Sequence, residues 1–79
     1  MDLIAEVESE IVTAHRRYGE FASTHEALGV LVEEFDELRD AIRSNQLESV
    51  RAEAIQVSAV ALRLASRCRD AGFSDRSSK

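Results

Sequence analysis

The chain has 79 residues, a length that excludes a two-domain enzyme, a nucleotide-binding α/β sheet and a TIM barrel. It has no proline and is 44% apolar, a composition typical of helices. The net charge of −5 argues against a nucleic-acid-binding protein, whose phosphate contacts require a basic surface, and 11 of the 15 acidic residues lie within residues 1–43.

The first predicted helix begins near Ile4 and ends before Gly19, a residue that often terminates helices. Its apolar residues recur at intervals of three and four, as on one face of a helix. They are Ile4, Val7, Ile11, Ala14 and Tyr18.

A second helix is predicted to begin at Ser23, because Ser23 and Glu26 have the spacing of a capping box. In that motif Ser23 accepts a hydrogen bond from the amide of Glu26, and the Glu26 carboxylate returns to the amide of Ser23. The main apolar stripe of this helix is Leu28, Leu31, Phe35, Leu38 and Ile42. A second row beside it, which we call the flank, consists of Ala27, Val30, Glu34, Glu37 and Ala41 and is expected to be partly buried.

A third helix is predicted after Asn45, which with Glu48 repeats the capping pattern, and it is expected to end at Gly72. Its apolar stripe is Val50, Ala54, Val57, Ala61, Leu64 and Cys68. We therefore expect one helical domain over residues 1–73 and a disordered polar tail over residues 74–79.

The expected fold is all-α: an antiparallel hairpin of the second and third helices plus an N-terminal helix. A chain of this size buries a small core, so we expect it to assemble into an oligomeric bundle, either a dimer or a tetramer. Phe35, Tyr18 and Cys68 are expected to be core residues, Cys68 as a buried thiol. A single cysteine and the lack of a long apolar stretch favour a reduced, cytoplasmic setting without a membrane.

Four polar residues on the two later helices have matching positions relative to the turn. With a pivot at residue 45, Glu37 lies level with Glu53 and Glu34 lies level with Gln56. The two layers stand roughly 12–17 Å from the turn. Converging carboxylates repel one another unless protons or a cation intervene, and Mg²⁺ prefers such oxygen ligands. The alternative is a solvated acidic face without a metal, which is common on surface helices.

The run from Glu33 to Leu38, followed after 14 intervening residues by Glu53-Ala54-Ile55-Gln56, resembles the ExxE…ExxD pattern of the MazG-like nucleoside triphosphate pyrophosphohydrolases. The stretch from His25 to Leu64, with Arg17-Tyr18-Gly19 upstream, looks like the short MazG-like proteins of phages and bacteria. The chain departs from the pattern at Gln56, where the family has an aspartate.

The resemblance implies a homo-oligomer that hydrolyses a nucleoside or deoxynucleoside triphosphate to the monophosphate and pyrophosphate with Mg²⁺, for which Mn²⁺ can substitute. Glu34, Glu37, Glu53 and Gln56 would be metal ligands, Gln56 through its neutral carbonyl oxygen. Glu33 would be a further ligand or would orient the attacking water, which makes Glu33 and Glu34 the expected catalytic residues.

Arg63 and Arg67 continue the Glu53–Gln56 side of the third helix, where they would either clamp phosphates or pair with acids of a partner subunit. Two other functions stay open: a non-catalytic helical interaction module, and a nucleotide binder that has lost hydrolysis through Gln56.

Overall fold

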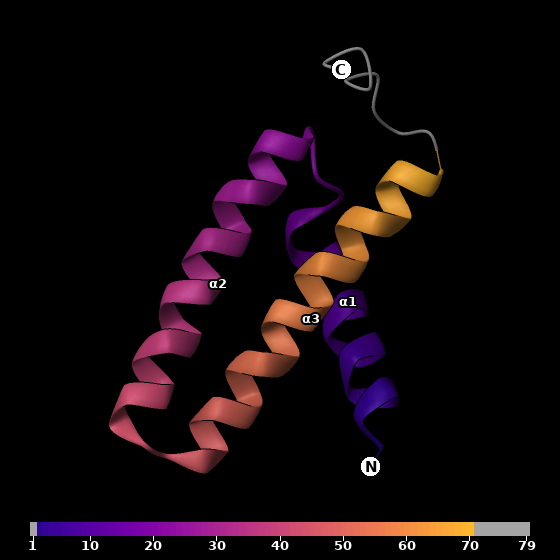
Figure 1. Cartoon of the computed structure of the whole chain (residues 1–79). Helices are drawn as coiled ribbons and strands as arrows, with labels where there is room; N and C mark the ends of the chain where they lie inside the picture. Colours follow the sequence, from indigo (N-terminus) through magenta and orange to yellow (C-terminus); the bar gives the residue numbers. More distant parts are fainter. Residues whose placement is uncertain (1, 71–79) are drawn as a thin grey trace.

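The computed structural model describes residues 2–70, and helices are the sole regular secondary structure in that range, which confirms the all-α prediction. Its helices are α1 (Leu3–Tyr18), α2 (Thr24–Ser44) and α3 (Leu47–Arg69). Figure 1 shows α2 and α3 side by side and running in opposite directions, with α1 packed mainly on α3. The predicted helix end at Gly72 and the tail 74–79 lie outside the described residues. None of the three helices is both long and apolar enough to cross a membrane.

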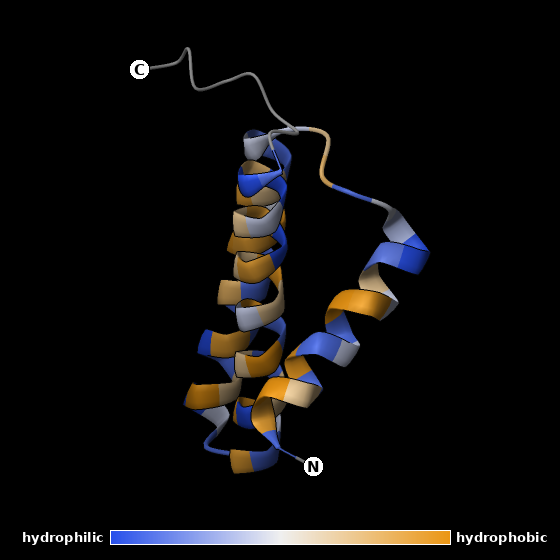
Figure 2. Ribbon diagram, turned by 90° about the vertical axis from the view of Figure 1, so that its right-hand side faces the viewer, coloured by the Kyte–Doolittle hydropathy of each residue, from blue (hydrophilic) through white to orange (hydrophobic). Residues whose placement is uncertain are grey.

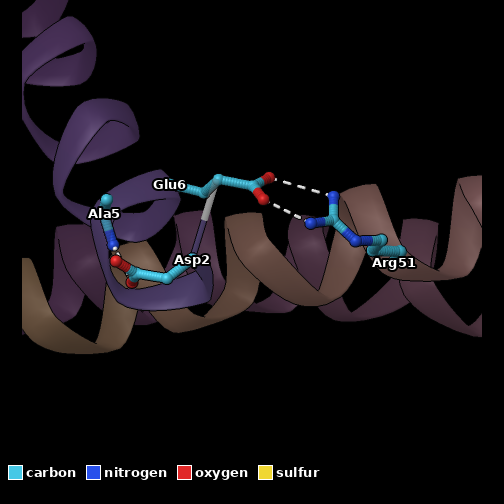
Figure 3. A network of polar contacts seen from close by, with 4 residues as sticks. All are labelled: Asp2, Ala5, Glu6 and Arg51. Atoms are coloured by element: carbon cyan, nitrogen blue, oxygen red, sulfur yellow. Dashed lines mark hydrogen bonds and ion pairs between the residues drawn. The ribbon is translucent and has the colours of Figure 1, made fainter.

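Side chains cap the first two helices. Asp2 Oδ1 accepts a hydrogen bond from the amide of Ala5 at 2.9 Å (Figure 3). Ser23 Oγ accepts one from the amide of Glu26 at 3.0 Å, as predicted. The return bond differs from the prediction, because the Glu26 carboxylate accepts from the amide of Ala22 at 2.6 Å instead of from Ser23.

The turn between α2 and α3 corrects the predicted cap at Asn45. Asn45 ends α2 in the left-handed conformation, with φ 61°, and its amide donates to the carbonyls of Ala41 and Ile42. Asparagine tolerates this conformation better than most residues. Gln46 takes the N-cap position of α3 without a side-chain cap, so Asn45 closes one helix instead of opening the next.

The buried residues of α2 belong to the flank, although Leu31 of the main apolar stripe also packs, partly buried, against the core cluster of Phe21, Ala27 and Val60. Ala27 is fully buried and Ala41 nearly so, and Ala59 and Val60 of α3 are buried too. Small side chains allow two helices to approach closely, while the larger stripe residues Leu28, Phe35 and Ile42 stay more than half exposed. Phe35 is consequently 56% exposed, so its predicted place in the core of the single chain was wrong.

The other predicted core residues also need correction. Tyr18 is 71% exposed and Cys68 is exposed, because both lie on helix faces that no other described helix covers. Among residues 2–70 the buried aromatic residue is Phe21, in the connection between α1 and α2, which packs with Ala27 and Val60.

Near its N-terminal end, helix α1 is bound to α3 by an ion pair. Both terminal nitrogens of Arg51 donate to the Glu6 carboxylate, one of them at 2.9 Å (Figure 3). Figure 2 shows that α1 leaves the other two helices as it continues toward Gly19. Gly19 then reverses the chain with φ 76°, a value that favours glycine. The divergence makes room for a cavity on this side of α3.

Candidate metal centre and adjoining cavity

Three carboxylates converge between α2 and α3. Glu34 and Glu37 come from adjacent turns of α2 and Glu53 comes from α3, and one oxygen of each lies within 4.8 Å of the others. The i, i+3 spacing places the first two on one side of α2. The short turn at Asn45 and the buried alanines of the flank then bring this side against α3. The structure thus brings together the three acids that the sequence placed in matching layers.

Burial and the repulsion between neighbouring acids favour the protonated form of two members of this cluster, Glu34 and Glu53. The pKa of Glu34 rises from its ordinary value of 4.5 to about 7, first because the carboxyl is desolvated and then because Glu37 and Glu53 carry like charge. Burial, followed by the charge of Glu37, also raises the pKa of Glu53. At pH 7 the Glu34 carboxyl is therefore only partly protonated, and a cation could take the place of its proton.

The cluster has the donor set and the open oxygens that a hard cation requires. Glu34 Oε1 and Glu53 Oε1 are both buried and accept no hydrogen bond from an N–H or hydroxyl group, so the carboxyls of the cluster have only a proton shared among themselves. Buried polar atoms normally have partners, so each of these needs an explanation. Carboxylate oxygens without donors suit Mg²⁺ or Mn²⁺, and the residues present therefore fit such an ion.

Gln56, the fourth predicted ligand, contacts an acid from the first helix. Its Nε2 donates a hydrogen bond of 2.8 Å to Oε1 of Glu10, and the pair is partly buried. Glu10 is not one of the three clustered acids, but it lines the same cavity as Glu34 and Gln56. Helix α1 thus contributes a carboxylate that the sequence analysis did not anticipate.

A cavity of about 440 Å³ adjoins the cluster at Glu34, whereas Glu37 and Glu53 are not part of its wall. All three helices and the connection between α1 and α2 contribute to its walls. Acidic, basic and apolar side chains are all represented: Glu10, Glu33, Glu34, Arg17, Arg63, Tyr18, Phe21, Val30 and Val60. Glu33, expected as a catalytic residue, lies in this wall, on the exposed side of α2. The size and mixed chemistry suit a small organic anion better than an apolar ligand.

Arg63 is a buried cation in the cavity wall. It is only 7% exposed, its Nη2 donates to the carbonyl of Gly19 at 3.2 Å, and its guanidinium lies over the ring of Phe21. Its Nε is buried without a hydrogen-bond partner, and burial lowers the pKa of the guanidinium. Within residues 2–70 no carboxylate lies within 4.0 Å of its nitrogens, although the charge of Glu26 acts on it from farther away, so Arg63 retains a capacity for an anion.

Arg67, predicted beside Arg63 as a phosphate ligand, has a different environment. Its Nε donates to the carbonyl of Phe21 at 2.8 Å, and its Nη1 pairs with Glu20 at 3.0 Å. It is not part of the wall of the acidic cavity. The two arginines together hold residues 19–21 against α3, and only Arg63 also faces the cavity.

Sequence reasoning missed three features of this site: the position of Glu10, the place of Arg17 in the wall and the burial of Phe21. A weak signal existed for Phe21, which lies two residues before the N-cap Ser23, because hydrophobic residues just before a helix N-cap often pack onto that helix. No local pattern indicated Glu10, whose neighbour depends on how α1 lies across α3.

No protein-family model, curated protein or solved structure matches this chain.

Proposed function

We propose that the protein is a Mg²⁺-dependent nucleoside triphosphate pyrophosphohydrolase. The observation that carries the proposal is the convergence of Glu34, Glu37 and Glu53, two of whose oxygens are buried without a donor. The resemblance of the Glu33–Gln56 region to the MazG-like pattern supports the same reaction. In that reaction water attacks the α-phosphorus, the bond from it to the bridging oxygen breaks, and pyrophosphate leaves.

The side chains divide into two groups in this proposal. Glu34, Glu37 and Glu53 hold the metal with the carbonyl oxygen of Gln56, while Glu33 orients the attacking water or adds a further ligand. When bound, Mg²⁺ supplies charge neutralisation for the phosphates and lowers the pKa of water. Arg63, as the buried cation of the adjoining wall, receives the phosphate charge, while Arg67 keeps the connection in place.

Oligomerisation is part of the proposal. The main stripe of α2 leaves large apolar side chains in solvent, with Leu28, Phe35 and Ile42 each more than half exposed. A hairpin of α2 and α3 that pairs with a second copy through this stripe would remove that surface from water. We propose a homo-oligomeric bundle, dimer or tetramer, that works in a reducing cytoplasmic setting.

The direct test measures pyrophosphate and monophosphate release from a panel of nucleoside and deoxynucleoside triphosphates with Mg²⁺ or Mn²⁺. We expect turnover of at least one substrate, loss of turnover in Glu53→Gln, and normal turnover in Glu8→Gln. Glu8 is an exposed acid on α1 outside the cavity wall, so it controls for the loss of one negative charge. Lack of turnover at high enzyme concentration with either metal would refute the hydrolase.

A non-catalytic interaction module is the second candidate, and the exposed stripe of α2 is the observation that favours it. The two functions differ in their response to metal. A site present only in the folded state raises the thermal midpoint by mass action when Mg²⁺ is added. A module whose acids are solvated would show no such increase.

A further inference from the structure

We infer that Glu10 is a positioning residue that orients the Gln56 side chain so that its carbonyl oxygen, and not its amide nitrogen, is available to a divalent cation. The inference rests on the metal site of the proposed function. It concerns a contact between α1 and α3 that neither the spacing of the acids nor the resemblance indicates.

The chemistry of the two side chains determines the orientation of the amide. An ionised carboxylate only accepts hydrogen bonds, whereas a primary amide has a donating end and an accepting end. The 2.8 Å contact therefore uses Nε2 of Gln56, because the reverse orientation would place two oxygens against each other. With its nitrogen held by Glu10, the amide has only its oxygen left for another partner.

Without Glu10, the amide would find other acceptors. Glu34 lines the same cavity as Gln56, and its Oε1 has no donor. An unrestrained Gln56 gains a hydrogen bond by turning its NH₂ group toward such an oxygen. That orientation would occupy a lone pair that a cation needs and would direct hydrogens toward the ion. Glu10 prevents this by offering a competing acceptor from α1.

The orientation matters here because Gln56 is neutral. A carboxylate at this position would have two equivalent oxygens and would need no orienting partner. A glutamine has one ligating atom, and half of its amide orientations exclude the metal. The hydrogen bond from α1 thus makes a neutral ligand usable, and contacts of this kind around a metal site typically change affinity by about 10–100-fold.

The test is Mn²⁺ affinity, measured by electron paramagnetic resonance titration of the full chain, with no nucleotide present. We expect Glu10→Ala to weaken Mn²⁺ binding about 10-fold or more relative to the wild-type chain. Glu10→Gln offers an amide that can accept or donate, so its affinity should fall between the two. Glu8→Ala is the matched control, since it removes one acid from the exposed side of the same helix and should change affinity little.

A second background separates orientation from simple charge. In Gln56→Glu the ligand needs no orienting partner, so adding Glu10→Ala should not weaken Mn²⁺ binding further. An equal loss in both backgrounds would show that Glu10 acts only through its charge, and would overturn the inference. Equal effects of Glu10→Ala and Glu8→Ala in the original background would overturn it as well.

Two further outcomes keep this inference distinct from the proposed hydrolase. A wild-type chain that binds no Mn²⁺ would contradict both the metal site and the role of Glu10. A chain that binds Mn²⁺ with the expected variant pattern, yet releases no pyrophosphate, would contradict the hydrolase and support the role of Glu10. Circular dichroism of each variant verifies that the helices are intact.

Discussion

The guanidinium carbon of Arg63 lies 4.2 Å from the centroid of the Phe21 ring. A cation over an aromatic face is attracted by the ring, and the attraction increases when both groups are out of water. Arg63 is 7% exposed and Phe21 is 5% exposed, so both meet that condition. The pair joins the connection between α1 and α2 to the middle of α3.

Phe21→Ala should therefore destabilise the protein strongly. Removing a buried phenyl ring costs about 3–5 kcal/mol and here also removes the partner of Arg63. Urea unfolding followed by circular dichroism measures the change. The control is Tyr18→Ala, three residues earlier and 71% exposed, which should stay within about 0.5 kcal/mol of the wild-type chain. Equal effects of the two substitutions would contradict a core role for Phe21.

Phe35→Ala should change association more than the stability of the single chain. Because Phe35 is half exposed in the chain alone, the 2–5 kcal/mol expected of a buried residue should not apply to the monomer. If the α2 stripe is the interface, the variant should weaken association by roughly 2 kcal/mol, a value typical of a central interface residue. Sedimentation over a range of concentrations measures this.

Leu47→Ala is the matched control for Phe35→Ala, because Leu47 is also a large exposed apolar residue but lies outside the α2 stripe. It should leave association unchanged. A wild-type mass of 8.8 kDa at micromolar concentration would contradict the oligomer itself.

The stability of the metal-free protein should depend on pH through Glu34. Its pKa is about 7 in the folded chain and near 4.5 when unfolded, so folding favours the protonated carboxyl. The contribution is fully present below pH 4.5 and is lost as the pH rises through 7. Glu34→Gln stays neutral, so in EDTA it should become more stable than the wild-type chain as the pH increases toward 8.

Mg²⁺ should reverse that comparison. A cation replaces the proton on Glu34, and this exchange is easier when the carboxyl is already ionised. Mg²⁺ should therefore raise the thermal midpoint of the wild-type chain more at pH 8 than at pH 5.5. Melting curves of both proteins at the two pH values, in EDTA and in millimolar Mg²⁺, provide the measurement. A constant difference between wild type and Glu34→Gln at every pH would exclude a raised pKa at this position.

Gln56→Asp should have opposite effects without and with metal. In EDTA it removes the hydrogen bond to Glu10 and adds a negative charge near other acids, which should cost about 1 kcal/mol or more. That cost corresponds to a decrease of roughly 4–8 °C in the midpoint. With millimolar Mg²⁺ the added carboxylate should tighten binding and recover the stability. The same shift in both conditions would contradict a ligand role for position 56.

The sequence predicted the acidic cluster because its geometry depends on local rules. Three-residue spacing and a turn at residue 45 suffice to place Glu34, Glu37 and Glu53 together. The side of α2 that packs was predicted less well, because the larger Phe35 seemed the better core residue. The buried residues of α2 are instead the small Ala27 and Ala41, so side-chain volume and not hydrophobicity distinguishes the packed side.

The contacts of α1 could not be predicted from the sequence. Three glutamates lie within two turns of α1, at positions 6, 8 and 10. Glu6 nevertheless pairs with Arg51, and Glu10 pairs with Gln56. Which acid meets which partner depends on the crossing of α1 over α3, and amphipathic spacing does not determine that crossing. The contact of Glu10 with Gln56 could therefore be found only in the structure.

The bonds that hold α1 and its connection to α3 join residues 44 to 46 positions apart. The turn between α2 and α3, by contrast, connects two helices that follow each other directly in the chain. These two helices can therefore pair before α1 has docked. We expect α1 to dock last during folding and to have no stable partner until α3 has left the ribosome. The cavity, whose wall includes Glu10 and Gly19, is then the final part of the molecule to be completed.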